Sequence, residues 1–535
     1  MNLIKKSSPM QKFFPALLAL AIALTSGVSN SYANSKQSFL SQSVVEKAQK
    51  SVVKIDVSIR KSAYGYTGAG TGTGFIVDKK RGLVATNAHI SDRKRIEILE
   101  LTFFNGREAK AKLIYSDPFV DFSFLKVDPE TIPENVTEVK FSAKPVLNDT
   151  SVFMVGSNEG QAFSVQDGVI TSIYDQSDYM TYQTMLVTLN NRGGSSGSPI
   201  FDKNGEVVGI IFGGSDTYAT AIYPKYLTKA LEDLQDSKIP ARYDCGLHIE
   251  YEALDKVARF SSFPSEELNQ YLKKFPDSRN LVLKVSSTLE DSSADKVIES
   301  GDVIWKVNGT LIGPRLYEMQ KIINNSPKKV TLEVYRHGKL INFEIETYPL
   351  DNHTIKRMVE LSGAMFYEVD YRIATLTGAK LGTVFMGNVN SASSFATLPH
   401  FYNVDTSIFQ NPIYLLSIES IAGHKIANLD DLVGAIPDLE KKKDFVLKYT
   451  TFGSYRTFGG GPYLAHRQEA SYIKYDNYIG RPTLFEYNSD AQEWDVKEVV
   501  GEQGKNPDVF TRERKQGEKP NPDTVGDKGG QKKEL

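Results

Sequence analysis

Short runs of residues typical of β-strands lie between residues 53 and 212, and the first of them, at 53–59, alternates apolar and polar positions. Turn residues separate many of these runs, and no long helical period occurs before about residue 225. Strands that alternate in this way bury one face, and several of them at short intervals are typical of an all-β sandwich or barrel. A short helix over residues 226–234 is expected to close this region. The runs lie at residues 53–59, 83–85, 96–104, 112–115, 122–127, 152–155 and 207–212.

A linker carrying Pro240 follows, and beyond it the pattern changes. Two further modules are predicted, at residues 245–350 and 355–455, because each mixes short strands with a helix. Residues 456–535 are predicted to form a C-terminal extension. From about residue 501 this extension is expected to be disordered, because Gly, Pro, Lys and Glu dominate it and few residues are apolar.

The helix of the last module has clear end signals. Asn428 is expected to cap its first turn, and Leu429, Leu432 and Ile436 then fall on one apolar face. Pro437 is expected to end it, because proline removes a backbone donor and clashes with the preceding turn.

The N-terminus has the pattern of a secretory signal peptide. Three lysines precede a 12-residue apolar run at 13–24, and Ser31 and Ala33 provide the small residues of a cleavage site after Ala33. The run is short for a bilayer span, although an uncleaved anchor or a buried helix stays an alternative. No later segment approaches 18 apolar residues, so we expect an exported chain, residues 34–535, without stable membrane insertion.

Charge and cysteine content exclude several classes of protein. The 535-residue chain has 63 Lys and Arg against 65 Asp and Glu, for a formal charge of −2. This balance gives no global attraction to nucleic acid, so no nucleic-acid partner is expected. Cys245 is the single cysteine, which excludes an internal disulfide framework and a cysteine-built zinc site.

A glycine-rich serine loop is the first candidate for chemistry. It is the G-x-S-G-S-P segment that begins at Gly194 and has Ser196 at its centre. A nucleophilic serine needs an exposed hydroxyl and backbone N–H groups that can bind an oxyanion, and flanking glycines permit such a tight loop. A hairpin with its turn at Asn204-Gly205 is predicted next. Taken alone, the segment is equally compatible with a plain Gly/Ser turn.

A candidate general base and a carboxylate to orient it favour the nucleophilic serine over the plain turn. His89 is the only histidine in the first 240 residues, and it follows the strand at 83–85. Asp121 precedes an apolar strand and is the candidate to orient it, whereas Asp117, followed by proline, is more typical of a turn. The chain order His, Asp, Ser is that of the chymotrypsin-type double barrel.

Residues 45–235 resemble the trypsin-like protease domain of the Deg/HtrA family. The resemblance rests on five segments in matching order, namely Gly72-Thr73-Gly74-Phe75-Ile76-Val77, Thr86-Asn87-Ala88-His89, Asp121, Gly194 to Pro199 and Ala221-Ile222-Tyr223-Pro224. It implies that His89 is the general base, Asp121 its orienter and Ser196 the nucleophile. It also implies an oxyanion hole made of the backbone N–H groups of Gly194 and Ser196.

The serine loop departs from the family pattern. Ser195 stands where the family usually has Asn, Ser198 stands where it usually has Gly, and the stretch 190–193 is one residue longer than usual. The resemblance therefore does not define the S1 pocket, and Ser195 stays an alternative nucleophile.

The two later modules resemble PDZ domains of the same family. In the first, Gly246-Leu247-His248-Ile249 stands at the position of the family's carboxylate-binding loop, and the following strand would pair with a peptide by β-augmentation. In the second, residues 361–366 are a weaker candidate loop. Small α/β domains that bind no peptide are the alternative for both modules.

The sequence thus predicts a mainly β fold, a chymotrypsin-like double β-barrel followed by two PDZ-like α+β domains. The predicted function is a serine endopeptidase that needs no cofactor and no metal. The resemblance implies unfolded or damaged proteins and peptides as substrates, a homo-oligomer of trimers or their multiples, and a periplasmic or secreted location. A non-catalytic chaperone or scaffold and a dedicated processing protease with one substrate are the alternatives.

Overall fold

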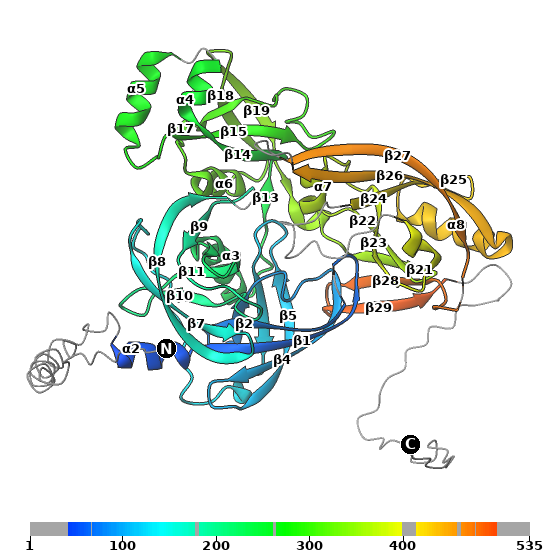
Figure 1. Cartoon of the computed structure of the whole chain (residues 1–535), viewed down its shortest axis with the longest axis horizontal. Coiled ribbons are helices and arrows are strands. Elements are labelled where there is room, and N and C mark those ends of the chain that lie inside the picture. The colour runs from blue at the N-terminus through cyan, green and yellow to red at the C-terminus, as the bar shows by residue number, and fades with distance from the viewer. Residues whose placement is uncertain are drawn as a thin grey trace, which may run out of the picture.

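The computed structural model describes residues 41–65, 67–176, 181–260, 264–398, 414–456, 462–476 and 478–499. The predicted signal peptide and the predicted disordered tail lie outside these residues. Figure 1 shows two barrels built by the N-terminal half of the chain, and the rest builds two larger sheets and a two-stranded ribbon. In the ranges just given, no helix is both long and apolar enough to cross a membrane.

The first barrel forms because its strands alternate as the sequence predicts. In β1 the side chains of Val53, Ile55, Val57 and Ile59 are buried inside the barrel, and the residues between them are partly or fully exposed. A short helix, α2 (Gln42–Gln49), precedes it, and the turn η1 (Pro129–Thr131) follows its last strand. The barrel closes in the order β1-β2-β3-β6-β5-β4, with β1 (Val52–Ser62), β2 (Gly68–Asp78), β3 (Leu83–Thr86), β4 (Arg95–Phe103), β5 (Glu108–Ser116) and β6 (Ser123–Val127).

The second barrel repeats this arrangement and confirms the predicted hairpin and closing helix. The hairpin turns at Asn204-Gly205, where Gly205 has a φ of 77° and donates to the carbonyl of Asp202 at 2.9 Å. Helix α3 (Lys225–Gln235) follows the barrel. The barrel closes in the order β10-β11-β12-β9-β8-β7, with β7 (Ser151–Asn158), β8 (Gln161–Asp175), β9 (Thr184–Val187), β10 (Pro199–Phe201), β11 (Val207–Gly214) and β12 (Ala219–Ile222). The chymotrypsin-like double barrel is therefore confirmed.

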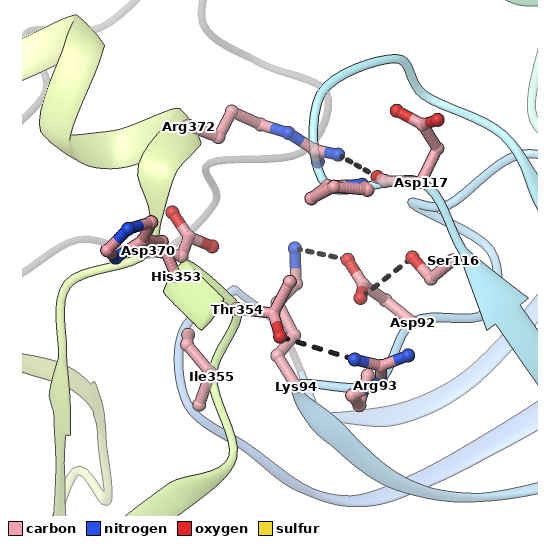
Figure 2. A pocket seen from close by; sticks show the side chains of 11 residues that line it. Asp92, Arg93, Lys94, Ser116, Asp117, His353, Thr354, Ile355, Asp370 and Arg372 are labelled. Atoms are coloured by element: carbon pink, nitrogen blue, oxygen red, sulfur yellow. Dashed lines mark hydrogen bonds and ion pairs between the residues drawn. The ribbon is translucent and has the colours of Figure 1, made fainter. Parts of the chain in front are cut away.

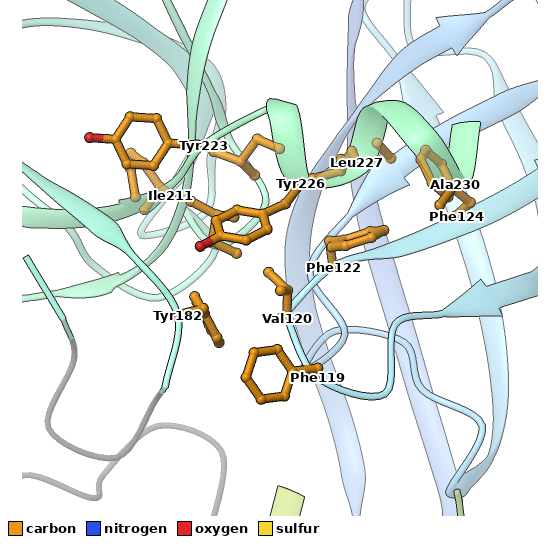
Figure 3. Close-up of a cluster of buried hydrophobic side chains, with 14 of the residues drawn as sticks. Phe119, Val120, Phe122, Phe124, Tyr182, Ile211, Tyr223, Tyr226, Leu227 and Ala230 are labelled. Carbon is orange, nitrogen blue, oxygen red and sulfur yellow. The ribbon is translucent and has the colours of Figure 1, made fainter. Parts of the chain in front are cut away.

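A continuous apolar cluster fills the seam between the barrels. Figure 3 shows aromatic side chains from the loop before β6 meeting side chains of the second barrel and of α3. Phe119 and Tyr182 lie with their ring centroids 6.1 Å apart, and Tyr182 and Tyr226 lie 6.0 Å apart. Burying such large side chains contributes roughly 1.5–3 kcal/mol each, so this seam holds the two barrels in one fixed relation.

The first of the two later modules is a mixed α+β domain, as predicted. Its sheet has the order β14-β15-β16-β18-β19, with β17 paired to β16, and a two-stranded ribbon of β13 and β20 ties its ends together. The strands are β13 (Tyr243–Asp244), β14 (Leu247–Ala253), β15 (Leu281–Thr288), β16 (Val303–Val307), β17 (Thr310–Leu311), β18 (Lys329–Arg336), β19 (Lys339–Glu346) and β20 (Tyr348–Pro349). The helices are α4 (Leu254–Phe260), α5 (Ser265–Lys274) and α6 (Leu316–Asn324).

The second of these modules is larger than predicted. Its nine-stranded sheet continues past residue 455, since β27 pairs along its whole length with β26 and β28 pairs with β21. The structure therefore moves its end from residue 455 to Glu498. The strands are β21 (Arg357–Leu361), β22 (Ala364–Glu368), β23 (Val384–Val389), β24 (Tyr414–Ile421), β25 (His424–Lys425), β26 (Asp444–Arg456), β27 (Pro462–Lys474), β28 (Thr483–Asn488) and β29 (Glu493–Glu498), with η2 (Leu350–His353), α7 (Tyr371–Thr377), η3 (Ser394–Thr397) and α8 (Leu429–Lys442).

Helix α8 confirms one end signal and corrects the other. Asn428 caps it with a full capping box, its side chain accepting from the N–H of Asp431 at 3.0 Å. The expected stop at Pro437 is wrong, because the helix continues to Lys442 with Pro437 inside it. Leu439 lies two residues beyond the proline and is fully buried in the module's core, so packing outweighs the lost backbone hydrogen bond.

Candidate active site

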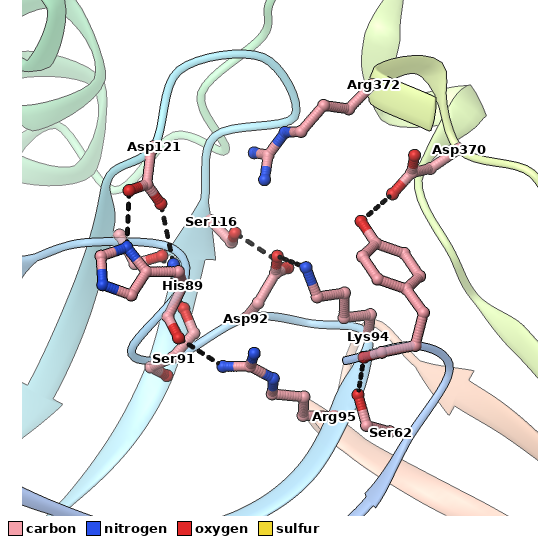
Figure 4. Close-up of polar contacts among 12 residues, drawn as sticks. Ser62, His89, Ser91, Asp92, Lys94, Arg95, Ser116, Asp121, Asp370 and Arg372 are labelled. Atoms are coloured by element: carbon pink, nitrogen blue, oxygen red, sulfur yellow. Dashed lines mark hydrogen bonds and ion pairs between the residues drawn. The ribbon is translucent and has the colours of Figure 1, made fainter. Parts of the chain in front are cut away.

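His89 and Asp121 are paired in a buried corner of the first barrel. His89 lies in the turn that follows β3, and Asp121 lies just before β6, the strand that pairs with β3. Nδ1 of His89 lies 2.7 Å from Oδ2 of Asp121, and the backbone N–H of His89 donates to Oδ1 at 2.8 Å. Both carboxylate oxygens are therefore committed to the histidine, as Figure 4 shows.

The electrostatics of this corner keep the carboxylate ionised. Burial opposes the charge of Asp121, but the attraction and hydrogen bonds of His89, together with the positive charge of Arg372, hold its pKa below the ordinary value. A charged carboxylate accepts the Nδ1 proton, which leaves Nε2 of His89 as the basic nitrogen. Nε2 makes no hydrogen bond to another residue within the described ranges.

The neighbouring residues hold this pair in place. Asn87 donates from its side chain to the carbonyl of Asp121 at 2.9 Å. Asp117, the rival aspartate, builds the turn before it, because its carboxylate accepts from the N–H groups of Phe119 at 2.9 Å and Val120 at 2.7 Å. The structure thus brings Asp121 to His89 and leaves Asp117 in the turn that its Asp-Pro context indicates.

The serine loop connects β9 to β10 and depends on two glycines with left-handed backbone. Gly194 has a φ of 98° and Gly197 a φ of 85°. A Cβ on Gly197 would lie 1.9 Å from the carbonyl oxygen of Thr73, so no other residue fits against the first barrel there. The N–H of Gly197 donates to the carbonyl of Ile211 at 2.8 Å. This close approach sets Ser196 at the seam between the two barrels.

Thr73 joins the serine loop to the histidine strand, a role that the sequence analysis did not assign. Its N–H donates to the carbonyl of Ser196 at 2.8 Å, and its hydroxyl donates to the carbonyl of Gly194 at 2.8 Å. Its own carbonyl accepts from the hydroxyl of Thr86, three residues before His89, at 2.7 Å. Ser196 and His89 are therefore anchored on the same residue of β2. The only sequence signal was its place in the Gly72-Thr73-Gly74 motif.

The three serines of the loop have different surroundings. Ser195 is fully buried and its hydroxyl lies 2.5 Å from Oδ1 of Asn191 and 2.6 Å from the carbonyl of Arg192, so it is held inside the loop. Ser198 is also fully buried, and its hydroxyl has no partner in the described part of the chain. Ser196 is partly exposed, and its hydroxyl bonds to none of the described residues. These surroundings favour Ser196 over Ser195 as the reactive hydroxyl.

Two backbone donors of the loop remain available. The N–H groups of Gly194 and Ser196 make no hydrogen bond to a backbone carbonyl among the residues that the structure describes, whereas those of Ser195, Gly197 and Ser198 all do. Two free donors flanking one residue are what a developing oxyanion requires. The longer stretch before them is held outside the loop, where Arg192 forms ion pairs with Glu159 and Asp216.

The predicted carboxylate-binding loop lies at the start of β14. Gly246 has a φ of 82°, Leu247 and Ile249 are buried, and burial lowers the pKa of His248. The N–H of Gly246 is already engaged within the chain, because it donates to Oδ1 of Asp244 at 3.0 Å.

The edge of β14 is also occupied. This strand is the last in its sheet, so one side of it carries no strand partner. Gln176, from the second barrel, donates from its side chain to the carbonyl of Ile249 at 2.6 Å and accepts from the N–H of Tyr251 at 3.3 Å. The role of residues 246–249 stays a prediction.

Among the described residues, no group of three or more His, Cys, Asp or Glu side chains is placed to hold a metal ion.

Comparison with known proteins agrees with this geometry. Residues 72–210 match the family model described as a trypsin-like peptidase domain. Protease Do-like 7 from Arabidopsis thaliana is 24% identical over 467 residues, covering 83% of this chain and 40% of its own length. The pro-apoptotic serine protease NMA111 from Meyerozyma guilliermondii is 26% identical over 429 residues, covering 78% and 42%. The chain spans about two fifths of the length of these curated relatives.

Among solved structures, the HtrA-type protease AlgW with a tripeptide aligns with 57% of this chain and 96% of its own, at 20% identity and a TM-score of 0.43.

The double barrel and the domain match define a trypsin-like serine protease fold. The two relatives are named as a Do-like protease and a serine protease, and with the domain match they support the resemblance to the Deg/HtrA family that the sequence predicts.

Proposed function

We propose that this protein is a serine endopeptidase that works through His89, Asp121 and Ser196. The observation that carries the proposal is the pairing of His89 with Asp121 at 2.7 Å beside a loop that leaves the Ser196 hydroxyl and two N–H groups unengaged. The trypsin-like peptidase domain match supports the same reaction class.

The proposed mechanism follows from these groups. Nε2 of His89 takes the proton of Ser196 as Oγ attacks the peptide carbonyl, and Asp121 stabilises the imidazolium that forms. The N–H groups of Gly194 and Ser196 bind the oxyanion. His89 then protonates the leaving amine, and water attacks the acyl-enzyme to release the second product and free Ser196.

The test uses a fluorophosphonate probe and fluorescently labelled casein. The probe phosphonylates an activated serine without requiring a matched S1 residue, and casein reports cleavage of an unstructured chain. We expect the wild type to react with both and Ser196→Ala to lose about 10⁴-fold or more in rate. Ser195→Ala is the matched control and should keep most of the activity. Equal casein cleavage by wild type and Ser196→Ala would overturn the proposal and favour a non-catalytic chaperone.

For the substrate class we propose unfolded or damaged proteins. The support is the resemblance to Deg/HtrA proteases that act on such chains. Cleavage-site profiling on a denatured proteome separates this from a dedicated processing protease. Many sites with small apolar P1 residues support the broad role, whereas one sharp site overturns it.

For the loop at Gly246-Leu247-His248-Ile249 we propose recognition of a peptide carboxyl terminus, in a PDZ-like module. The support is its place at the start of β14, an end strand of its sheet, which is the kind of edge used in β-augmentation. On this proposal Gln176 has to leave Ile249 and Tyr251 before a peptide strand can pair there.

We also propose export to a periplasmic or secreted location and assembly into trimers or their multiples. The support for export is the sequence pattern of residues 1–33, and that for assembly is the family resemblance. N-terminal sequencing of the mature protein should begin at Asn34, and light scattering of purified protein should give three protomers or a multiple. A retained N-terminus or a monomeric mass would overturn the corresponding part.

A further inference from the structure

The last module contacts the loop that carries the catalytic aspartate. Helix α7 lies against residues 117–121 of the first barrel, and a guanidinium N–H of Arg372 donates to the carbonyl of Asp117 at 3.2 Å. Figure 2 shows this contact at a small cavity between the module and the barrel. The contact joins the first turn of α7 to a residue four positions before Asp121.

Residues 117–121 form a stiff loop, so a contact at Asp117 also restrains the position of Asp121. The carboxylate of Asp117 accepts two N–H groups of the loop and lies 3.5 Å from a guanidinium nitrogen of Arg242. Phe119 packs between Tyr182 of the second-barrel side and Tyr371 of α7, with both ring centroids 6.1 Å away. Tyr371 and Arg372 therefore cover the outside of the loop whose inner end presents Asp121 to His89.

The charges around Arg372 come from four segments. Asp92, Asp117 and Asp121 face it from the first barrel and Asp370 from its own module, while Tyr64, which donates to Asp370 at 2.8 Å, and His353 complete the surroundings. Lys94 pairs with Asp92 at 3.2 Å, and Arg242 pairs with Asp117. Arg372 is thus the permanent cation beside Asp121 and Asp370, and Figure 4 shows its guanidinium pointing into the space beside Asp121 and Asp92.

The same module also supports the backbone of His89 through Arg95. The indole N–H of Trp494, in β29, donates to the carbonyl of Arg95 at 3.0 Å. The guanidinium of Arg95 in turn donates to the carbonyl of His89 at 2.6 Å. The last module therefore reaches both members of the pair through one intervening residue or loop.

We propose that Arg372 is a positioning residue of the protease, holding the Asp121 loop and setting the charge beside the His89–Asp121 pair from a different domain. The proposal rests on the proposed function. Arg372 supplies a positive charge beside Asp121 and so offsets part of the attraction of this carboxylate for a proton on His89. Without Arg372 this attraction is stronger, so the free base of His89 should form only at a higher pH.

The test measures the rate of fluorophosphonate labelling of the full chain between pH 5 and pH 9. Arg372→Gln removes the charge but keeps a donor near Asp117. The acidic limb of its profile, the pH range in which the labelling rate rises as His89 loses its proton, should move up by about 0.5–1 pH unit. The labelling rate should then fall about 3–10-fold near pH 6 and by less than about 2-fold near pH 9. Arg372→Lys keeps the charge and should restore the wild-type limb.

Lys61→Gln is the matched control, because it removes a cation from the same barrel–module interface, where Lys61 pairs with Glu360 at 2.6 Å, away from the loop. It should leave the limb in place. An unshifted limb in Arg372→Gln, or an equal loss at every pH, would overturn the positioning role. A wild type that never reacts would instead sink the proposed function, so the two failures are distinguishable.

Discussion

The two C-terminal modules contact different barrels through different chemistry. The first (residues 247–346) contacts the second barrel and α3 through separate hydrogen bonds. They join Gln176 to the edge of β14, Gln320 to the hydroxyl of Tyr226 at 2.8 Å, Tyr174 to Asp277 at 3.2 Å and Arg279 to Ser172 at 2.9 Å. No ion pair joins it to either barrel in the part of the chain that the structure describes. The second (residues 357–498) contacts the first barrel through the ion pairs of Lys61 with Glu360 and Lys112 with Glu493.

This difference indicates different roles. A side-chain amide on a strand edge makes the two hydrogen bonds that one residue of an added strand would make, so a peptide can replace it at little cost. The contact of the second module buries Tyr371 completely and reaches the supports of His89 and Asp121. We therefore expect the first module to separate reversibly from the barrels and the second to act as a fixed part of the active-site support.

The largest expected effect compares one tyrosine from each contact. Tyr371→Ala should lower the free energy of unfolding by about 3–5 kcal/mol, because it empties a fully buried site and leaves Asp244 without its 2.6 Å donor. Tyr317→Ala, in the partly exposed contact of α6 with α3, should cost only about 1–2 kcal/mol. Urea unfolding of both variants checks this, with Tyr371→Phe as the control that keeps the ring. Similar losses for the two alanine variants would remove the distinction between the modules.

The next expected effect is a pH dependence of stability, and it should arise only where the second module contacts the first barrel. Glu97 lies two residues from Arg95, and burial raises its pKa to about 7 with one carboxylate oxygen lacking a partner in the described part of the chain. Between pH 4.5 and 7 the folded chain holds a proton that the unfolded chain releases. Stability from this group is therefore full below pH 4.5 and is lost as the pH rises through 7.

Glu97→Gln should remove this dependence, so the variant should gain on the order of 2–3 kcal/mol relative to wild type between pH 5 and pH 8. Thermal unfolding across that range measures it. Gln176→Ala carries no titrating group and should show a difference from wild type that does not change with pH. A pH-independent difference for Glu97→Gln would contradict the expectation.

A third effect tests the reversible contact directly. Gln176→Ala removes the amide that competes for Ile249 and Tyr251, so the affinity for a peptide C-terminus should rise about 3–10-fold. Fluorescence polarisation with a labelled decapeptide ending in a free valine carboxylate is the measurement. The same peptide with an amidated end should bind weakly to both proteins. Unchanged affinity in the variant would show that Gln176 does not compete with the peptide for the edge of β14.

The smallest effect comes from the ion pair between Lys61 and Glu360. Their side chains are 39% and 18% exposed, so solvent and salt screen the attraction. A double-mutant cycle with Lys61→Gln and Glu360→Gln should give a coupling of roughly 0.2–1 kcal/mol that shrinks at high salt. A coupling above 2 kcal/mol would mean that surface charges, rather than Tyr371, hold the second module in place.

Local patterns carried most of the fold prediction. Short β-type runs separated by turn residues identified the barrel strands, and Asn-Gly and Asn428 located a turn and a helix start, because each depends on residues close in sequence. The end of α8 was missed because Leu439 packs in a distant core, and the end of the last module was missed because β28 pairs with β21, more than a hundred residues away.

The residues of the candidate site also fall into those that local patterns predict and those that they do not. The types and order of His89, Asp121 and Ser196 could be read from the chain, and so could the glycines that let the serine loop bend. Thr73 and Arg372 could not, because a threonine between glycines and an arginine in a short helix have no local pattern that points to a function.

The sequence by itself indicated an all-β barrel region, the resemblance to a protease family and the residue types of the proposed triad, because strand patterns and motif spacing act over short distances. Only the tertiary structure decided that Asp121 rather than Asp117 meets His89, that Thr73 ties the two barrels together, and that the last module reaches the triad through Arg372 and Trp494. These are contacts between residues dozens to hundreds of positions apart, and they exist only once separate elements have packed against one another.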